Sequence, residues 1–348
     1  MNIGIIGGGQ LARMLALAGY PLGLRFRVYD PSPEACAGQV APLTVGAFED
    51  VAALRRFAVG LDVVTFDFEN VPAASLRALV ETVRVAPGPQ ILDVAQDRVA
   101  EKTCARELGI PCGARWPVAD AGALTALLAE RPGEYVLKTC RFGYDGKGQA
   151  RIGAGRSLAA ALALADAQPC ILEALVPFER ELSIIATRGA NGELRCYPLT
   201  ENRHVDGILH TSRAPAPQHS DWQALAEGYI RAIAERHDYV GTLALELFQV
   251  GESLWFNEMA PRVHNSGHWT IEGAVCSQFE NHLRAICGWP LGETRARAAV
   301  LMENCIGAMP PIASLLGGED LHVHDYGKVP RAGRKVGHLT RLLAEATG

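Results

Sequence analysis

The feature that most constrains the fold is a short apolar strand, residues 2–6, that runs directly into a glycine turn at residues 7–9. Residues 11–18 follow with an apolar side chain at every third or fourth position, which marks one face of a helix. Two more apolar strands are predicted at residues 26–29 and 61–66. Strands that alternate with helices in this way form parallel sheets with helices on both faces. We therefore predict an N-terminal α/β domain built on a parallel sheet.

The composition excludes several classes of protein. The chain has 348 residues, enough for two or three domains at about 150 residues each. Hydrophobic residues make up 49% and the net charge is −5, so we expect a globular protein without general attraction to nucleic acid or an anionic membrane. No apolar run approaches the roughly 20 residues that span a bilayer, and we recognise no signal peptide. The nine cysteines include no Cys-x-x-Cys pair, so we expect free thiols and a cytoplasmic location.

The first glycine turn admits three interpretations. Gly7-x-Gly9-x-x-Ala12, with Asp30 at the end of the second predicted strand, has the spacing of a dinucleotide-binding fingerprint. This pattern motivates one alternative function, that of an NAD-dependent oxidoreductase. The second interpretation is a site for another phosphate, because the N-terminus of the following helix suits an anion. The third is a tight turn that binds no ligand.

A second glycine-rich loop, GYDGKGQ at residues 143–149, follows Lys138 at the end of a predicted strand. Its three glycines allow backbone N–H groups to wrap polyphosphate oxygens, and the lysine upstream supplies a positive charge. The loop lacks the Walker pattern G-x-x-x-x-G-K-[ST]. We predict phosphate binding here, and a flexible hairpin is the alternative.

Two glutamates on consecutive predicted strands form the most informative pattern. Residues 250–253 form a hairpin connection, and if the turn centres on Glu252, then Glu246 and Glu258 lie opposite one another. Two like charges across a strand pair destabilise the sheet, whereas a hard cation between them reverses that effect. Magnesium takes one or two carboxylates plus phosphate oxygens, so we predict a magnesium site, with two solvated glutamates as the alternative. Asn257 should point to the other face unless the chain bends there.

Two polar runs follow these strands. Five polar side chains fill seven positions directly after the second strand: Arg262, His264, Asn265, Ser266 and His268. Such a dense run is hard to explain by packing and indicates a reacting centre. Near the C-terminus four positive charges cluster: Lys328, Arg331, Arg334 and Lys335. They form either a clamp for a phosphorylated substrate or a solvated basic tail.

Six segments of the chain resemble those of one enzyme family. They are GIIGGGQLARM, TFDFENV, LKTCRFGYDGKGQ, YPLTENRHVDGILHTS, NEMAPRVHNSGHWT and YGKVPRAGRKVGH. Together, and in this order from residue 1 to about 340, they resemble N5-carboxyaminoimidazole ribonucleotide synthetases, ATP-grasp enzymes of purine biosynthesis. The chain departs from the family at Cys140-Arg141-Phe142, where the family often has small and polar residues, so the shape of the loop's flank stays open.

The resemblance implies an ATP-grasp fold of mixed α/β and α+β class. It divides the chain into a Rossmann-like (pre-ATP-grasp) parallel-sheet domain at 1–95, a linker helix with a small lid at 96–180, and a larger domain with a C-terminal substrate-binding segment at 181–348. The lid and the larger domain grip ATP. The family is usually dimeric, so the resemblance also implies a homodimer.

The resemblance assigns residues to ATP and magnesium. Arg98 and Lys138 approach the phosphates, the glycine-rich loop closes over them, and Glu181 takes the ribose hydroxyls. Glu246 and Glu258 hold magnesium, in agreement with the hairpin argument. The ATP-binding set is Arg98, Lys138, Gly143, Tyr144, Asp145, Gly146, Lys147, Gly148, Gln149, Glu173, Ala174, Leu175, Val176, Glu181, His204, Asn257 and Glu258.

The second substrate that the resemblance implies is 5-aminoimidazole ribonucleotide. The substrate-binding set is Gly8, Gln10, Glu69, His264, Asn265, Ser266, Lys328, Arg334 and Lys335. Bicarbonate attacks the γ-phosphate to give carboxyphosphate and ADP, and carboxyphosphate, or carbon dioxide released from it, carboxylates the exocyclic amine. The implied catalytic residues are Arg262, which orients bicarbonate, Asp145 and Lys328.

Other functions remain alternatives at this point. A formate-using purine transformylase and a biotin carboxylase share the ATP site, but the segments FDFENV, RVHNSGH and YGK…RKVGH favour the aminoimidazole enzyme. A non-catalytic nucleotide-binding module is a further alternative. Both metal carboxylates and all the basic groups are present, which counts against it.

Overall fold

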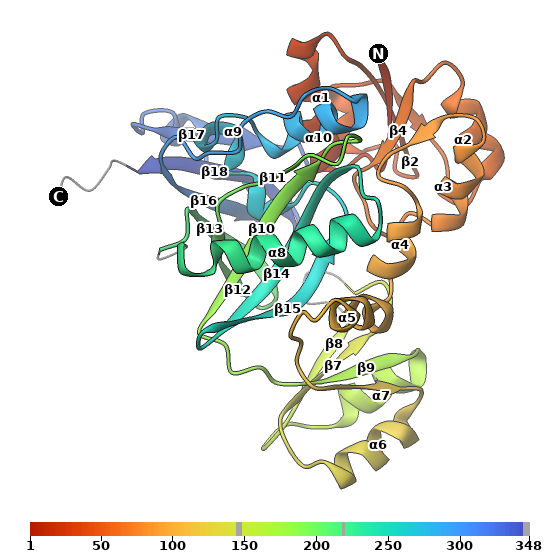
Figure 1. Cartoon of the computed structure of the whole chain (residues 1–348), viewed down its shortest axis with the longest axis vertical. Helices are drawn as coiled ribbons and strands as arrows, with labels where there is room; N and C mark the ends of the chain where they lie inside the picture. The colour runs from red at the N-terminus through yellow and green to blue at the C-terminus, as the bar shows by residue number, and fades with distance from the viewer. Residues whose placement is uncertain (144–147, 218–219, 344–348) are drawn as a thin grey trace.

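The described part of the chain forms three β-sheets that follow one another in the sequence (Figure 1). The computed structural model describes residues 1–143, 148–217 and 220–343. The N-terminal sheet and the large C-terminal sheet lie side by side at one end of the molecule. The lid sheet lies at the other end (Figure 1). None of the described helices is long and apolar enough to cross a membrane.

The N-terminal sheet is parallel throughout, with strand order β3-β2-β1-β4-β5. Its strands are β1 (Asn2–Ile6), β2 (Arg25–Asp30), β3 (Leu43–Val45), β4 (Val63–Phe66) and β5 (Arg84–Val85), and its helices are α1 (Gln10–Gly19), η1 (Tyr20–Leu22), η2 (Cys36–Gln39), α2 (Val51–Ala58) and α3 (Ala73–Val80). All four residues of β4 are buried, as expected of a central strand covered on both faces. The predicted parallel-sheet domain is therefore confirmed.

The lid is an antiparallel sheet of order β6-β9-β7-β8 with its own hydrophobic core. It contains β6 (Arg115–Val118), α6 (Ala121–Glu130), β7 (Tyr135–Thr139), β8 (Gln149–Ile152), α7 (Ala159–Ala167) and β9 (Cys170–Ala174). Two helices, α4 (Gln90–Ala95) and α5 (Arg98–Glu107), connect it to the N-terminal sheet. The β7–β8 hairpin fixes both ends of the glycine-rich loop, because Lys138 pairs with Gln149 and Thr139 N–H donates to Gly148 O at 2.8 Å.

The large sheet is antiparallel, with order β15-β14-β10-β12-β13-β16-β18-β17 and β11 paired with β10. Its strands are β10 (Arg180–Arg188), β11 (Leu194–Cys196), β12 (Thr200–Val205), β13 (Ile208–Ala214), β14 (Gly241–Val250), β15 (Ser253–Ala260), β16 (Ala299–Ile306), β17 (Leu321–Asp325) and β18 (Lys335–Leu343). Its helices are α8 (Ser220–Arg236), η3 (Asn265–Gly267), α9 (Thr270–Gly273), α10 (Gln278–Cys287) and α11 (Ile312–Leu315). The predicted domain divisions at 95 and 180 stay predictions.

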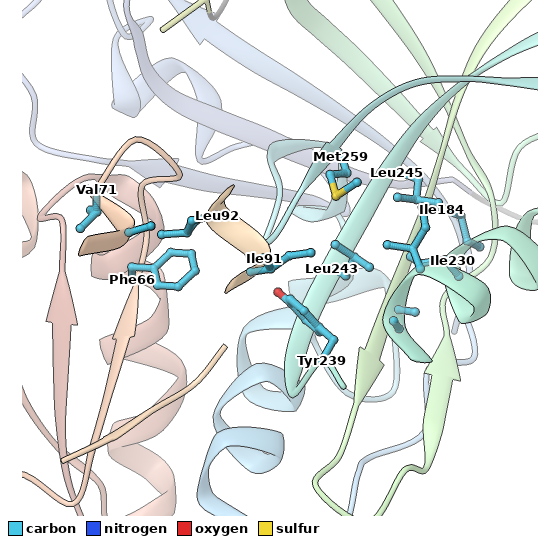
Figure 2. Close-up of a cluster of buried hydrophobic side chains, with 14 of the residues drawn as sticks. Phe66, Val71, Ile91, Leu92, Ile184, Ile230, Tyr239, Leu243, Leu245 and Met259 are labelled. Atoms are coloured by element: carbon cyan, nitrogen blue, oxygen red, sulfur yellow. The ribbon is translucent and has the colours of Figure 1, made fainter. Parts of the chain in front are cut away.

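One continuous hydrophobic core joins the N-terminal sheet to the large sheet (Figure 2). Phe66 at the end of β4 and Leu92 on α4 belong to the same buried cluster as Leu243 and Ile184 on the large sheet. The buried Ile91 of α4 lies between the two sides (Figure 2). Burial of a side chain of this size stabilises a fold by about 1.5–3 kcal/mol, so this shared core holds the two sheets in a fixed relation.

The segment 272–288 does not form one continuous helix. It is divided between the end of α9 and the whole of α10, because Ser277 caps α10 by accepting a hydrogen bond from Glu280 N–H at 3.1 Å. The C-terminal region forms strands. Its Pro/Gly-rich and basic stretch contains β17 and β18, which complete the large sheet.

Candidate active site

A cavity of about 1340 Å³ lies where the three sheets meet. Most of the residues predicted to bind ATP, metal or substrate line it. The lining residues from the predicted sets are Gln10, Glu69, Arg98, Lys138, Gly143, Gly148, Gln149, Glu173, Ala174, Leu175, Val176, Glu181, His204, Glu246, Asn257, Glu258, Arg262, His264, Asn265, Lys328, Arg334 and Lys335. Segments that are far apart in the sequence therefore share one site.

The remaining predicted residues lie elsewhere. Gly8 and Ser266 are buried behind the cavity wall, where Gly8 N–H donates to Asp30 Oδ2 at 2.7 Å and Ser266 contacts other side chains. Tyr144, Asp145, Gly146 and Lys147 lie outside the described residues. For those four positions the predicted roles stay predictions.

Glu173 on β9 lies between two lysines at one side of the cavity. Lys138 Nζ on β7 is 2.7 Å from Glu173 Oε2, and Lys102 Nζ on α5 is 2.8 Å from Oε1. Burial alone would raise the pKa of Glu173, but the two ammonium groups lower it to about 2. The carboxylate is therefore ionised, and the trio keeps one net positive charge beside the cavity, as a site for phosphates requires.

Arg98 connects the start of α5 to both the lid and the large sheet. The side chain of Asp97 caps the helix by accepting from Val99 N–H at 2.9 Å, and Arg98 N–H donates to Cys140 O at 3.0 Å. Arg98 Nη1 reaches Glu258 Oε2 on β15 at 2.8 Å. In the unusual segment 140–142, Cys140 N–H donates to Pro169 O at 3.0 Å and Arg141 Nε lies 3.4 Å from Asp97 Oδ2. Phe142 has a left-handed backbone, with φ of 62°.

The two metal-site glutamates lie opposite one another, as predicted, but for a different reason. Val250 pairs with Ser253, so the turn centres between Gly251 and Glu252 and not on Glu252. That register would place Asn257 opposite Glu246. A β-bulge then shifts the pairing by one residue and brings Glu258 opposite Glu246. The same bulge lets Asn257 line the cavity beside Glu258, which regular strand alternation would prevent.

The residues around this pair fit a magnesium ion. Burial and the neighbouring Glu258 carboxylate raise the pKa of Glu246. Burial also disfavours ionisation of Glu258, but the positive charges of Arg98 and Lys138 lower its pKa. The buried Oδ1 of Asn257 accepts no hydrogen bond within the described part of the chain. Two opposed carboxylates and a free amide oxygen are the hard ligands that magnesium prefers, and bound phosphates would complete its coordination.

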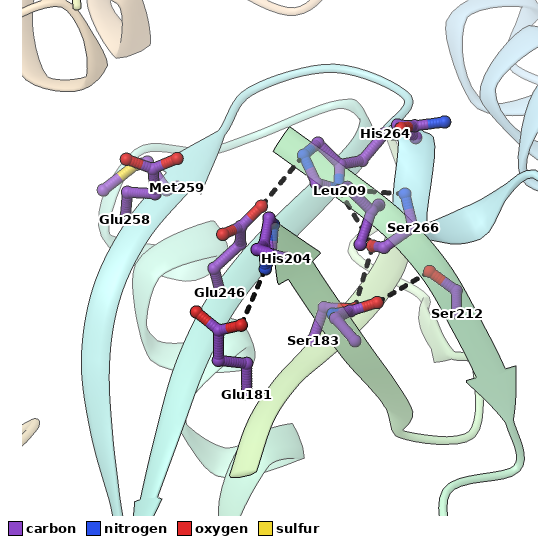
Figure 3. A network of polar contacts seen from close by, with 12 residues as sticks. Glu181, Ser183, His204, Leu209, Ser212, Glu246, Glu258, Met259, His264 and Ser266 are labelled. Carbon is purple, nitrogen blue, oxygen red and sulfur yellow. Dashed lines mark hydrogen bonds and ion pairs between the residues drawn. The ribbon is translucent and has the colours of Figure 1, made fainter. Parts of the chain in front are cut away.

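Two further ion pairs orient predicted site residues. His204 Nδ1 on β12 is 2.8 Å from Glu181 Oε2 on β10 (Figure 3). Arg262, directly after β15, pairs through Nε with Glu69 Oε2 from the loop after β4. Arg262, which is predicted to orient bicarbonate, is thus held against Glu69, which is predicted to bind the aminoimidazole.

The basic cluster lies at the N-terminal side of the cavity. Lys328 Nζ donates to Gln10 Oε1 on α1 and to Lys335 O at 3.4 Å. The ring of Tyr326 lies under the same ammonium group, 5.5 Å from its centroid. Burial lowers the pKa of Lys328. These contacts hold a partly desolvated lysine beside Arg334, where an anionic group of a ligand would meet both.

The first glycine turn is filled by the protein's own carboxylates. Asp30 accepts from Gly8 N–H at 2.7 Å and from Ser32 N–H at 2.8 Å. Asp67, directly after β4, accepts from Ala12 N–H of α1 at 3.1 Å, where a bound phosphate would lie. The fingerprint spacing therefore does not indicate NAD, and that alternative is wrong for this turn. Burial raises the pKa of Asp67 to about 6.

Gly7 makes room for Asp67, and this gives a stability prediction. A Cβ on Gly7, which has φ of +95°, would lie 1.8 Å from Asp67 Oδ1. We expect Gly7→Ala to lower the free energy of unfolding, measured by urea denaturation, by about 3 kcal/mol. Gly60→Ala is the matched control, because Gly60 has φ of +75° and nothing within 4 Å. Equal losses in the two variants would contradict the role of the Asp67 contact.

Among the residues of this site that sequence reasoning missed are Lys102 and Asp67. Lys102 lies four residues after Arg98 on α5, so that helical spacing places both cations on one face. This signal was available in the sequence. Asp67 belongs to the motif TFDFENV, but its contact with α1 spans 55 residues and nothing in the local pattern indicates it.

The sheet arrangement and the cavity define the class of the protein. The ATP-grasp domain family matches residues 103–279, so the chain is an ATP-grasp protein with the predicted lid and large sheet. The ribonucleotide synthetase preATP-grasp domain matches residues 1–96, and the phosphoribosylaminoimidazole carboxylase C-terminal domain matches residues 300–347. More narrowly, the chain belongs to the N5-carboxyaminoimidazole ribonucleotide synthase family of ligases.

Similarity to members of this family extends over nearly the whole chain. The N5-carboxyaminoimidazole ribonucleotide synthase of Pseudomonas aeruginosa is 48% identical over 345 residues, which cover 99% of this chain and 95% of the relative. The synthetase structure from Thermus thermophilus superposes with a TM-score of 0.92 at 54% identity, covering 98% of this chain and 93% of that one. The synthase of Aspergillus clavatus, solved with ADP and 5-aminoimidazole ribonucleotide, has a TM-score of 0.90 at 28% identity, with 98% and 93% coverage.

Proposed function

We propose that this protein carboxylates the amine of 5-aminoimidazole ribonucleotide in purine biosynthesis, using ATP and bicarbonate and releasing ADP and phosphate. The observation that carries the proposal is the single cavity that joins an ATP-type set of residues to a basic cluster from the C-terminal segment. The names of the relatives point to the same reaction, and the Aspergillus relative was solved with ADP and this acceptor. No second function is favoured by a described contact.

The ATP end of the cavity suits phosphoryl transfer. Lys138 and Arg98 would face the phosphates, with Glu173 and Glu258 as the carboxylates that hold these cations in place. Glu181, tied to His204, would accept hydrogen bonds from the ribose. Positioned positive charges lower the barrier because negative charge spreads over the transferred phosphoryl group in the transition state.

Magnesium fits this site through Glu246, Glu258 and the amide oxygen of Asn257. When bound, the ion would neutralise charge on the phosphates of ATP. Its binding would also remove the repulsion between the two facing carboxylates.

The acceptor and bicarbonate would occupy the other end. Lys328, Arg334 and Lys335 would bind the ribonucleotide phosphate, with Gln10 beside them. Arg262, fixed by Glu69, would orient bicarbonate for attack on the γ-phosphate, giving carboxyphosphate and ADP. The amine would then take the carboxyl group from carboxyphosphate or from carbon dioxide released from it. A closed lid would keep water from this intermediate.

The direct test is ADP release from Mg-ATP in bicarbonate buffer, measured with and without 5-aminoimidazole ribonucleotide. We expect a large increase with the ribonucleotide and transfer of labelled bicarbonate into an acid-labile product. ATP hydrolysis at the same rate with and without the ribonucleotide would contradict the proposed acceptor but not the ATP site. No hydrolysis by folded protein would refute the enzyme itself.

The proposal also covers compartment and assembly. All nine cysteines are free thiols, which supports a reducing compartment such as the cytoplasm. The homodimer implied by the resemblance is part of the same proposal, and light scattering of the purified protein would test it.

A further inference from the structure

A chain of buried side-chain hydrogen bonds crosses three neighbouring strands and ends at His264 (Figure 3). Ser212 Oγ on β13 contacts Asn202 Oδ1 on β12 at 2.7 Å, and Asn202 Nδ2 contacts Ser183 Oγ on β10 at 2.9 Å. Ser183 Oγ then reaches Ser266 Oγ at 2.8 Å, and Ser266 Oγ lies 2.9 Å from His264 Nδ1. The four residues behind His264 are buried, with at most 7% of any one exposed.

The main chain determines which ring nitrogen of His264 carries the proton. Ser266 N–H points at His264 Nδ1 from 3.3 Å, as the side-chain cap of η3. A backbone N–H can only donate, so Nδ1 must be the unprotonated nitrogen. The proton of the neutral ring is therefore on Nε2, which lies 3.2 Å from Glu246 Oε1 at the cavity.

The buried chain has a direction that agrees with this tautomer. Ser212 donates to the carbonyl oxygen of Asn202, and the amide nitrogen of Asn202 donates to Ser183. Ser183 then donates to Ser266, whose own hydroxyl hydrogen is left for His264 Nδ1. Reversing the Asn202 amide would reverse every bond and make Nδ1 a donor, in conflict with Ser266 N–H.

We infer that Ser266, Ser183 and Asn202 are positioning residues that fix His264 as an Nε2–H hydrogen-bond donor toward the reacting centre. The inference rests on the proposed function and deepens it. A ring in this state has no lone pair facing the cavity, because Nε2 on that side carries the proton and Nδ1 faces the two donors of Ser266.

This assignment limits what His264 does in the reaction. It holds the Glu246 carboxylate, and it can donate in the same way to an oxyanion of bicarbonate or of the carboxylated product. It is not the base that takes the proton from the acceptor amine. That proton must go to another group, such as a phosphate oxygen or a carboxylate.

The first test reads the tautomer without any reaction. Histidine ¹⁵N–¹H correlation spectra of the protein without nucleotide, assigned by comparison with His264→Gln, should show Nδ1 as an unprotonated ring nitrogen and Nε2 as a protonated one. We expect Ser266→Ala to broaden or shift these signals, because one donor to Nδ1 is lost. A protonated Nδ1 in the unaltered protein would overturn the inference.

The second test compares two amides at the same position. Gln places an amide N–H near the position of Nε2, and Asn places one near Nδ1, while neither acts as a base. We expect His264→Gln to keep a kcat about tenfold above that of His264→Asn. Equal losses of about 100- to 10,000-fold in both variants would point to a general base and overturn the inference.

A matched pair of strand variants separates positioning from stability. Ser183→Ala and Thr187→Val each remove a buried hydroxyl of β10, since Thr187 Oγ1 bonds Thr242 Oγ1 at 2.8 Å. We expect similar losses of thermal stability, but a fall in kcat of about fivefold in Ser183→Ala alone. Equal kcat values in these two variants would overturn the inference. Failure of the proposed function is distinct, because it would abolish ribonucleotide-dependent ADP release in the unaltered protein and leave the tautomer spectra unchanged.

Discussion

Replacing Glu258 by Gln is expected to lower kcat for ribonucleotide-dependent ADP release by about 100- to 1,000-fold, the size of effect seen when one pre-organised group that stabilises transition-state charge is removed. Glu258 meets Arg98 at 2.8 Å and faces Glu246 across the hairpin. The amide removes the charge that holds Arg98 and one of the two carboxylates proposed for magnesium. Steady-state kinetics at saturating substrates would measure the loss, and the half-saturating magnesium concentration should rise in the same variant.

The fold should tolerate this change, so the loss can be assigned to chemistry. The amide is nearly isosteric with the carboxylate and relieves the repulsion with Glu246. Glu252→Gln is the matched control, because Glu252 is exposed in the turn of the same hairpin and does not line the cavity. We expect it to leave kcat and the magnesium dependence unchanged. A Glu258→Gln variant with kcat within threefold of the unaltered protein would contradict the metal and phosphate role.

The pairing of Glu246 with Glu258 shows what a strand pattern in the sequence can predict about a site and what it cannot. The sequence indicates two strands, a short connection and two acidic positions on one face, and these features are present. A turn centred on Glu252 predicts that Glu246 faces Glu258. The observed turn centres half a residue earlier, and the bulge at Asn257 restores this pairing. A bulge depends on the twist of the strands and on what packs beside them. In this hairpin β14 also pairs with β10, and Phe256 N–H of β15 donates to Pro111 O at 2.7 Å. A local pattern does not contain that information.

The first glycine turn shows the opposite case, in which a correct motif suggested a wrong ligand. A strand, a glycine turn and a helix were predicted and observed. Glycines at positions 7 and 9 are needed because a Cβ at either would meet the Asp67 carboxylate, at 1.8 and 2.9 Å. In this protein the glycines therefore make room for the carboxylate of Asp67, whereas in a dinucleotide-binding turn they make room for a phosphate. Only the tertiary contact between Asp67, directly after β4, and α1 distinguishes the two ligands.

The residues brought together by the C-terminal segment could be predicted only through family resemblance. The basic pattern from Lys328 to Lys335 is equally compatible with a solvated tail. Its place in the cavity follows from β18, which pairs with β16 on one side and with β17 on the other, and from the contact of Lys328 with Gln10 some 318 residues away. Long-range pairing of this kind leaves little trace in local periodicity.

Replacing Lys328 by Met is expected to raise the KM for 5-aminoimidazole ribonucleotide by about 10- to 100-fold, because a hydrogen bond to a charged group is worth ~1.5–3 kcal/mol. Lys328 is held toward the cavity by Gln10, by Lys335 O and by the ring of Tyr326. Met keeps the apolar stem against that ring but removes the charge. Initial rates with varied ribonucleotide and saturating ATP would give the change in KM.

The KM for ATP separates a substrate clamp from a general disturbance of the site. Lys328 lies with Gln10 and Arg334, whereas the cations proposed for ATP, Arg98 and Lys138, are held by carboxylates of their own. The KM for ATP in Lys328→Met should therefore stay within about twofold of its original value, since the two groups of cations share no described contact. Arg341→Met removes an exposed positive charge from β18 away from the cavity and should change neither constant, which controls for long-range attraction of anions. An unchanged KM for the ribonucleotide in Lys328→Met, or equal increases for both substrates, would mean that the basic segment covers the cavity without binding the acceptor's phosphate.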